Sequence, residues 1–190
     1  RLGALGPQTI LAHAVHLDDD DIAILAEKQV VLSTNPVSNY KLASGVFLFQ
    51  KLFDAGCRIA IGTDSMASNN NLSMLEEMKL CSLSAKIQSS DPTSAPAQEV
   101  FRAATQTGAE AFGLQAGIIA ENKLADCILV DLGNHLLVPN YNLISNMVYS
   151  ADSSCIDTVI CNGRIIMQNH LVPHEQEIIG ETRKISDFFR

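Results

Sequence analysis

The sequence lacks an apolar run long enough to cross a lipid bilayer. Hydrophobic residues make up 47% of its 190 positions, yet polar and charged residues interrupt every apolar stretch before it reaches the roughly 20 residues that a membrane helix needs. This pattern predicts a soluble globular protein with no membrane partner.

Clustered positive charge is also missing. Lys and Arg together number 13 against 21 Asp and Glu, which gives a net charge of -8. Proteins that bind nucleic acid concentrate Lys and Arg on one face, so we expect no nucleic-acid partner.

The cysteines lack the paired spacing of a metal-binding motif, and their odd number does not suit a disulfide framework. Reduced thiols in a cytosol fit this usage better, so we expect a cytoplasmic protein whose cysteines serve in packing. The five are Cys57, Cys81, Cys127, Cys155 and Cys161.

The sequence does contain an apolar run that ends in an acid. In Arg58–Asn70, which reads RIAIGTDSMASNN, apolar residues lead through Gly62 and Thr63 to Asp64, and a polar loop follows. A short apolar run of this kind is typical of a strand covered on both faces. An acid at its end can hold a metal or transfer a proton. Alternatively, Asp64 caps a helix that begins near Leu72.

A second apolar run, Ile10–Val15, carries His13 near its end. The acidic residues Asp18–Asp21 that follow predict a helix start, because the helix dipole favours negative charge in the first turn. The predicted helix ends near Lys28.

A third apolar run, Val30–Thr34, stops at Asn35 and Pro36, because proline cannot continue the hydrogen bonding of a strand. We expect a loop there, and it carries the polar residues Ser38 and Asn39.

An amphipathic helix over Phe47–Ala55, ended by Gly56, completes an order in which strands and helices alternate. Such repeats form parallel sheets, and polar groups that follow the strands gather at the carboxyl ends. Periodicity leaves open whether the sheet closes into a barrel or stays open. No glycine-rich phosphate-binding fingerprint follows any strand, which disfavours dinucleotide binding. The side chains expected in one pocket are His13, Asn35, Ser38, Asn39, Asp64 and Ser68.

Helical patterns follow the third predicted strand. Leu72–Ile87 predicts a helix with its leucines facing inward and charged residues such as Glu77 facing outward. Ala97–Thr107 predicts another helix, which ends at Gly108.

The chain then becomes β-type. The dipeptide Asn162-Gly163 between two apolar runs is a strong hairpin signal. A charged helix over 175–189 is predicted at the end of the chain. The β-type runs are Ile118 and Ile119, Ala125–Leu132, Met147–Tyr149, Thr158–Cys161 and Arg164–Met167.

Taken together, these motifs resemble those of the amidohydrolase superfamily, in particular its methylthioadenosine and S-adenosylhomocysteine deaminase branch. The resemblance covers nearly all of the chain and corresponds to the C-terminal half of those enzymes. The motifs that carry it are AHAVHL, STNPVSNYKLASG, GTDSMASNN, ISNMVYS and ICNGR, in this order.

The resemblance implies an α/β fold: the C-terminal part of a (β/α)8 barrel, strands six to eight, plus part of a small β-sandwich. Residues 1–114 would form the barrel part, 115–173 the sandwich part and 174–190 a C-terminal helix. The chain begins with Arg1 shortly before a predicted strand, so we expect that an upstream half is missing.

By the same resemblance, Asp64 matches one ligand of a catalytic divalent metal, which we expect to be zinc. The other ligands lie upstream in the family, so the chain alone should neither hold the metal tightly nor turn over substrate, because zinc takes about four ligands. Asp64 would also accept and pass on a proton. His13 would lie beside the metal-bound water, where the alternative is a buried histidine satisfied by the backbone.

Ser68 and Asn39 would contact the substrate, although short polar side chains also cap loops. The function that this implies is hydrolytic deamination of an adenosine-type nucleoside with release of ammonia. Other amidohydrolase chemistry remains open, namely a chlorohydrolase, a guanine-deaminase-like enzyme or a cyclic amide hydrolase, as does a non-catalytic barrel fragment. The expected partners are a purine nucleoside-like small molecule and either a second copy of the chain or the missing N-terminal half.

Overall fold

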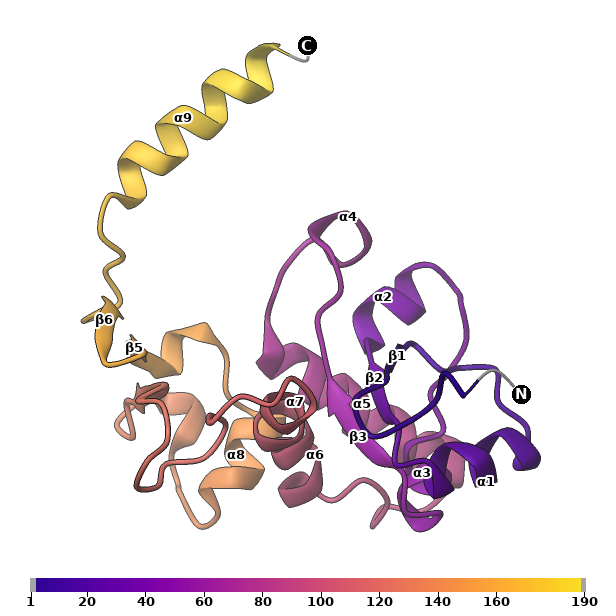
Figure 1. Ribbon diagram of the computed structural model, residues 1–190. Coiled ribbons are helices and arrows are strands. Elements are labelled where there is room, and N and C mark those ends of the chain that lie inside the picture. Colours follow the sequence, from indigo (N-terminus) through magenta and orange to yellow (C-terminus); the bar gives the residue numbers. More distant parts are fainter. Residues whose placement is uncertain (1–2, 189–190) are drawn as a thin grey trace.

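Three parallel strands form the sheet that organises the first part of the molecule. The computed structural model describes residues 3–188, and in it the sheet has the order β1-β2-β3 (Figure 1). The register places Ile10 opposite Val31 and Leu32 opposite Ile59. Val31 and Leu32 are fully buried, as expected for a parallel sheet covered on both faces. The strands are β1 (Ile10–Ala12), β2 (Val31–Thr34) and β3 (Arg58–Ile61).

The two helices that the sequence predicts between these strands are present, although the second begins at Phe49 and not at Phe47. Helix α1 (Asp19–Glu27) has a capping box, in which the Asp18 side chain accepts from the Asp21 N–H and the Asp21 side chain accepts from the Asp18 N–H. Helix α3 (Phe49–Asp54) is followed by Gly56, whose φ of +80° suits a helix stop. The predicted alternation of strands and helices is confirmed.

Two segments predicted as loops instead contain short helices. Helix α2 (Pro36–Lys41) follows β2, and helix α4 (Met66–Asn69) follows β3. Pro36 does end the strand, but its fixed φ and missing N–H also suit the first turn of a helix. Lys41 donates to the Ala67 carbonyl at 3.1 Å, which ties α2 to α4 on the same side of the sheet (Figure 1).

A helical layer packs against β3 and against itself. Helices α6 and α7 lie against β3, whereas α8 lies against α5 and α6, where the Tyr149 hydroxyl is 2.7 Å from Ser82 Oγ. The strand prediction for Met147–Tyr149 is wrong, because these residues end α8, which the Asn142 side chain caps. The helices are α5 (Met74–Ser89), α6 (Ala97–Ala104), α7 (Gln106–Ala111) and α8 (Leu143–Tyr149).

The predicted orientation of the long helix α5 is wrong in part, although Met78 is buried as predicted. Leu83 and Ile87 are exposed, whereas Glu77 is completely buried. The buried positions of α5 are Glu77, Met78, Cys81, Ser82 and Ala85. The buried face of this helix therefore mixes apolar and polar residues and packs mainly against other helices, and the carboxyl group of Glu77 lies inside the protein.

A second, antiparallel sheet has the order β4-β5-β6. Asn162 and Gly163 join β5 to β6 with φ values of +48° and +75°, so the predicted hairpin is confirmed. The strand prediction for Ile118 and Ile119 is wrong, because neither residue lies in a strand. The elements are β4 (Cys127–Val130), η1 (His135–Leu137), η2 (Ser153–Cys155), β5 (Ile156–Cys161) and β6 (Arg164–Met167).

Helix α9 (Glu175–Phe188) extends away from the rest of the molecule (Figure 1), and none of its described residues is buried. The predicted charged helix is confirmed up to residue 188, and residue 189 lies outside the described residues. The domain boundaries after 114 and after 173 stay predictions.

The cysteines are unpaired, but they do not all pack inside. Cys57, Cys81 and Cys155 are buried, Cys127 is half-buried and Cys161 is exposed, so the packing role is wrong for Cys161. Burial raises the pKa of Cys81 to about 12, which keeps that thiol protonated. Over residues 3–188, no helix is both long and apolar enough to span a membrane.

Candidate active site at the carboxyl ends of the parallel strands

His13 and Asp64 meet at the carboxyl end of the sheet. His13 directly follows β1, and Asp64 follows β3 after Gly62 and Thr63. His13 Nε2 lies 3.9 Å from Asp64 Oδ2. Both residues have a positive φ, +67° and +60°. This left-handed conformation costs roughly 1 kcal/mol or more per residue, and such strain is concentrated at functional sites.

The carboxylate of Asp64 is held by donors from helix α2 and from the residue that follows it in the chain. Ser38 Oγ donates to Oδ2 at 2.6 Å, and the Ser65 N–H donates to Oδ1 at 2.7 Å. The hydrogen bond from Ser38, followed by those from Ser68 and the Ser65 N–H, holds the pKa of Asp64 below its ordinary value. Asp64 is therefore an ionised, partly exposed carboxylate.

Asp64 does not cap the helix that follows it. The N-cap of α5 is Ser73, whose side chain accepts from the Glu76 N–H at 3.3 Å. The alternative interpretation of Asp64 as the cap of a helix near Leu72 is therefore wrong. Its side chain is engaged by Ser38 and its own loop instead.

Asn39 orients the imidazole of His13. Its Oδ1 lies 2.8 Å from His13 Nδ1, and Asn39 itself is almost fully buried on α2. An amide oxygen accepts, so Nδ1 carries the proton and Nε2 is the ring nitrogen nearest Asp64. In the neutral ring Nε2 is then an acceptor, and it becomes a donor once the ring is protonated. The alternative of a backbone-satisfied histidine does not describe His13.

Unpartnered polar atoms gather beside this pair. Among the described residues, the buried side-chain atoms without a hydrogen-bond partner are Thr34 Oγ1, Asn35 Oδ1 and Asn39 Nδ2. All three follow or end β2, and native proteins leave few such atoms unsatisfied. Gly62 leaves room for the Asn35 side chain, because a Cβ at that position would lie 2.9 Å from Asn35 Nδ2. The end of β2 therefore offers polar groups that a ligand could bind.

The structure brings all six side chains that the sequence predicts for one pocket to this end of the sheet: His13, Asn35, Ser38, Asn39, Asp64 and Ser68. Ser68 lies on α4, with its Oγ 3.2 Å from Ser65 Oγ. Ser65 was not predicted, although a polar residue directly after the strand-ending acid is a signal that could have identified it.

A metal ion would find only part of its coordination sphere in this chain. No group of three or more His, Cys, Asp or Glu over residues 3–188 could hold one. The two oxygens of Asp64 accept from Ser38, Ser68 and the Ser65 N–H, which leaves lone pairs for one ligand position.

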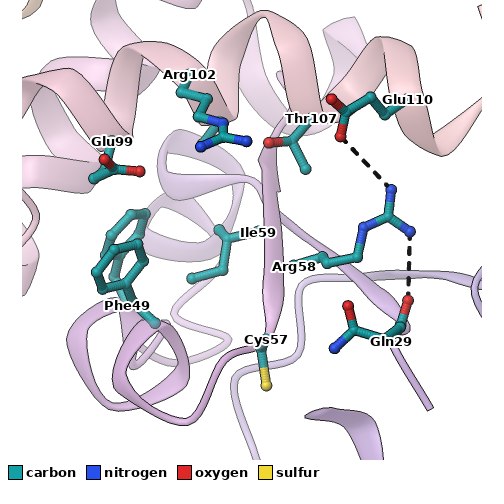
Figure 2. A pocket seen from close by; sticks show the side chains of 11 residues that line it. Gln29, Phe49, Cys57, Arg58, Ile59, Glu99, Arg102, Thr107 and Glu110 are labelled. Atoms are coloured by element: carbon teal, nitrogen blue, oxygen red, sulfur yellow. Dashed lines mark hydrogen bonds and ion pairs between the residues drawn. The ribbon is translucent and has the colours of Figure 1, made fainter. Parts of the chain in front are cut away.

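A separate pocket lies at the opposite end of β3, where Arg58 begins the strand. It has a volume of about 270 Å³, and Figure 2 shows Arg58 between the Gln29 carbonyl, at 3.4 Å, and the Glu110 carboxylate, at 3.9 Å. Arg102 and Glu99 also line it, so its cationic and anionic side chains balance. These groups suit a structural role, because the amino ends of parallel strands are generally devoted to stability.

Comparison with known proteins identifies the family of this chain. The amidohydrolase family matches residues 1–166. A 5-methylthioadenosine/S-adenosylhomocysteine deaminase of Thermococcus kodakarensis is 51% identical over 87% of this chain and 39% of its own length. A 5'-deoxyadenosine deaminase of Methanospirillum hungatei is 43% identical over 98% of this chain and 42% of its own length. The chain thus spans about two fifths of the curated relatives it matches.

Solved structures share the fold. A crystal structure of an adenosine deaminase from Xanthomonas campestris with bound zinc matches with a TM-score of 0.93 and 33% identity, covering 98% of this chain and 44% of that one. An atrazine chlorohydrolase from Arthrobacter aurescens complexed with zinc has a TM-score of 0.83 at 24% identity, covering 94% and 41%, which shows the fold alone. The mixed α/β fold, the motifs and these matches together establish that the chain belongs to the amidohydrolase family.

Proposed function

We propose that this chain is the C-terminal part of a metal-dependent enzyme that hydrolytically deaminates an adenosine-type nucleoside. The observation that carries the proposal is the contact between the strand ends: an ionised Asp64, held by Ser38, lies 3.9 Å from His13 Nε2. Relatives that are named as deaminases of adenosine-type compounds support the substrate class.

The metal, which we propose is zinc, would be held by Asp64 together with ligands from polypeptide outside this chain. When bound, such an ion supplies a nucleophilic water whose pKa falls to about 7. An aspartate oxygen is an established zinc ligand, and about three further ligands are needed. Neighbouring solved structures contain zinc, which supports this choice of ion.

Asp64 would then transfer the proton of the reaction, and His13 would form hydrogen bonds to the reacting oxygen. One oxygen of Asp64 takes the proton of the attacking water and passes it to the departing amine, so that water and the amine-bearing carbon yield a carbonyl and ammonia. His13 Nε2 accepts from the water while the ring is neutral, and it donates to the developing oxyanion once the ring is protonated. Asn39 holds the ring in the orientation that both roles require.

The substrate would meet the polar groups around this pair. Asn39 Nδ2 is buried and without a partner among the described residues, and Ser68 lies on the neighbouring helix α4. We propose that these two side chains bind polar atoms of a purine nucleoside.

We also propose that the sheet is part of a larger barrel, as its strands six to eight. In the described residues, β1 and β3 are edge strands with one hydrogen-bonded neighbour each. Edge strands in globular proteins are covered or paired. Additional strands would pair with both edges and would carry the other metal ligands, while the β4-β5-β6 sheet would contribute to a sandwich.

The test uses a complete enzyme, meaning this chain joined to or co-expressed with a polypeptide that supplies the remaining barrel strands, such as the matching segment of the Thermococcus kodakarensis relative. Ammonia release is measured with 5-methylthioadenosine, S-adenosylhomocysteine, 5'-deoxyadenosine and guanine, and chloride release is measured with a chlorinated triazine. We expect release from the adenosine-type compounds, loss of release in Asp64→Asn, and unchanged release in Asp54→Asn, which alters an exposed acid on α3.

Three outcomes would contradict the proposal. Preference for the triazine or guanine would assign the site to another amidohydrolase reaction. Failure of a zinc-loaded enzyme to act on any compound would favour a non-catalytic role. Full ammonia release by folded Asp64→Asn would remove Asp64 from the chemistry.

A further inference from the structure

A carboxyl group lies buried beneath the candidate active site. Glu77, on the inward face of α5, has no solvent exposure, although glutamate is rarely buried completely. Burial raises its pKa to about 7. A group that is this costly to bury needs compensating contacts, and Glu77 has them on two elements that carry site residues.

The first contact joins Glu77 to α2. Its Oε2 accepts from the Val37 N–H at 3.1 Å. Val37 lies in the first turn of α2, where backbone N–H groups have no partner within the helix. The next two residues along the chain are Ser38 and Asn39, which hold Asp64 and His13 respectively.

The second contact joins Glu77 to the loop that carries Asp64. Its Oε1 accepts from Asn69 Nδ2 at 2.6 Å, and the same Nδ2 donates to the Thr63 carbonyl at 2.6 Å. Thr63 directly precedes Asp64. The path from Glu77 through Asn69 therefore reaches the backbone at which Asp64 adopts its strained positive φ.

Together these contacts form a ring of interactions that links Glu77, α2 and the segment before Asp64. Val37 precedes Ser38, Thr63 precedes Asp64, and Ser38 Oγ and Asp64 Oδ2 are 2.6 Å apart. Resting on the proposed function, we infer that Glu77 is a positioning residue: by binding the N–H of α2 and the side chain of Asn69, it sets the separation of Ser38 and Asp64 and so the placement of the reactive carboxylate.

Above its pKa of about 7 Glu77 is ionised, and this carboxylate suits the position better than the isosteric amide. Both oxygens of Glu77 accept, one from Val37 and one from Asn69. In Glu77→Gln one oxygen becomes an NH₂ donor, which would face either the Val37 N–H or Asn69 Nδ2. Asn69 could restore a bond by turning its own amide over, but it would then withdraw its donor from the Thr63 carbonyl.

The test measures kcat per bound metal in the complete enzyme carrying Glu77→Gln, because loss of folded protein lowers metal content without changing that ratio. We expect kcat per metal to fall about tenfold or more, the scale of a displacement of reacting groups by a fraction of an ångström, while KM stays within about twofold. Glu76→Gln is the matched control, since it removes the neighbouring exposed acid of the same helix and should leave both constants unchanged.

A second variant approaches the same contact from the other side. Asn69→Ala leaves the buried carboxyl in place but cuts its connection to Thr63, so it keeps the inference testable if Glu77→Gln fails to fold. We expect a comparable loss of kcat per metal. The double variant should lose no more than Glu77→Gln alone, because both changes interrupt one path.

An independent readout is the visible absorption spectrum of enzyme loaded with Co²⁺, which reports the geometry around the ion. Glu77→Gln should change this spectrum and Glu76→Gln should not. If the parent and Glu77→Gln have equal kcat per metal and identical cobalt spectra, the positioning role is overturned while the deaminase function stands. If the parent binds Co²⁺ but releases no ammonia, and only Glu77→Gln alters the spectrum, the proposed function is overturned and the positioning role is upheld.

Discussion

Ser38 on α2 donates a 2.6 Å hydrogen bond to the carboxylate of Asp64, which follows a different strand. This contact joins the ends of β2 and β3 and is the largest cause of the lowered pKa of Asp64. The Ser38 side chain therefore controls the charge of Asp64, the proposed metal ligand.

Ser38→Ala should raise the pKa of Asp64 toward its ordinary value, because the carboxylate loses its strongest hydrogen bond. As the pH falls, a larger fraction of Asp64 is then protonated and unable to bind a cation. We expect the affinity of the complete enzyme for zinc to decline at a higher pH than in the parent. Zinc titrations over a series of pH values measure this.

Ser44→Ala is the matched control, since Ser44 is exposed on the loop after α2. Its zinc titration should follow that of the parent throughout. A Ser38→Ala enzyme with the same pH dependence as the parent would show that the hydrogen bond does not control the charge of Asp64.

Asn39→Ala should lower kcat by about tenfold or more, because the imidazole of His13 loses the partner that fixes its Nδ1 proton. Steady-state kinetics on zinc-loaded enzyme measure this, with the exposed Asn140→Ala as control. Unchanged kcat in Asn39→Ala would mean that the ring needs no such orientation.

Several of these residues follow from the sequence because their signals are local. Apolar runs that end at His13 and Asp64 predict strands, and parallel strands place the residues after them together. The Asn162-Gly163 hairpin and the capped start of α1 are read from a few neighbouring residues in the same way.

The sequence predictions failed where distant contacts decide the structure. The orientation of α5 was inferred from its leucines. Glu77 is nevertheless buried, because its carboxyl group accepts hydrogen bonds from Val37 and Asn69, which lie 40 and 8 residues away. Met147–Tyr149 has strand-forming residues, yet packing against α5 and α6 makes it helical. Pro36 ends a strand and begins a helix at once, and its strand-ending role alone was predicted.

Gly62→Ala should destabilise the protein by about 1–2 kcal/mol, because the added methyl group would lie 2.9 Å from Asn35 Nδ2 and 3.2 Å from Ser33 Oγ. Thermal or urea denaturation measures this. In the control Gly108→Ala, the new Cβ meets nothing within 4 Å on helix α7, and the better helix propensity of alanine should leave stability equal or slightly higher. Equal stability of the two variants would contradict the close approach of β2 and β3 at Gly62.

The buried Glu77 should make folding stability depend on pH. Its pKa is raised by burial from 4.5 to about 7, so between these values the folded state holds a proton that the unfolded state has released. The contribution of Glu77 to the free energy of unfolding is therefore most favourable below the lower of these two pKa values. It declines by up to roughly 3 kcal/mol as the pH rises from the lower value to the higher one.

Urea denaturation of the parent and of Glu77→Gln on either side of this pH range measures the effect. The difference in unfolding free energy between the two should shift in favour of the glutamine variant as the pH rises. Glu76→Gln should keep the same direction of pH dependence as the parent in weakened form, because the charge of Glu76 is a minor cause of the raised pKa of Glu77. A constant difference would show that Glu77 titrates at an ordinary pKa.

The central claim is that Asp64 binds the catalytic metal, and the most direct measurement is a crystal structure of the complete zinc-loaded enzyme with the ion located by its anomalous scattering. We predict that an oxygen of Asp64 lies about 2.0–2.2 Å from the zinc, the distance of a coordinating carboxylate. A zinc ion bound elsewhere, with the Asp64 oxygens beyond coordination distance, would contradict it.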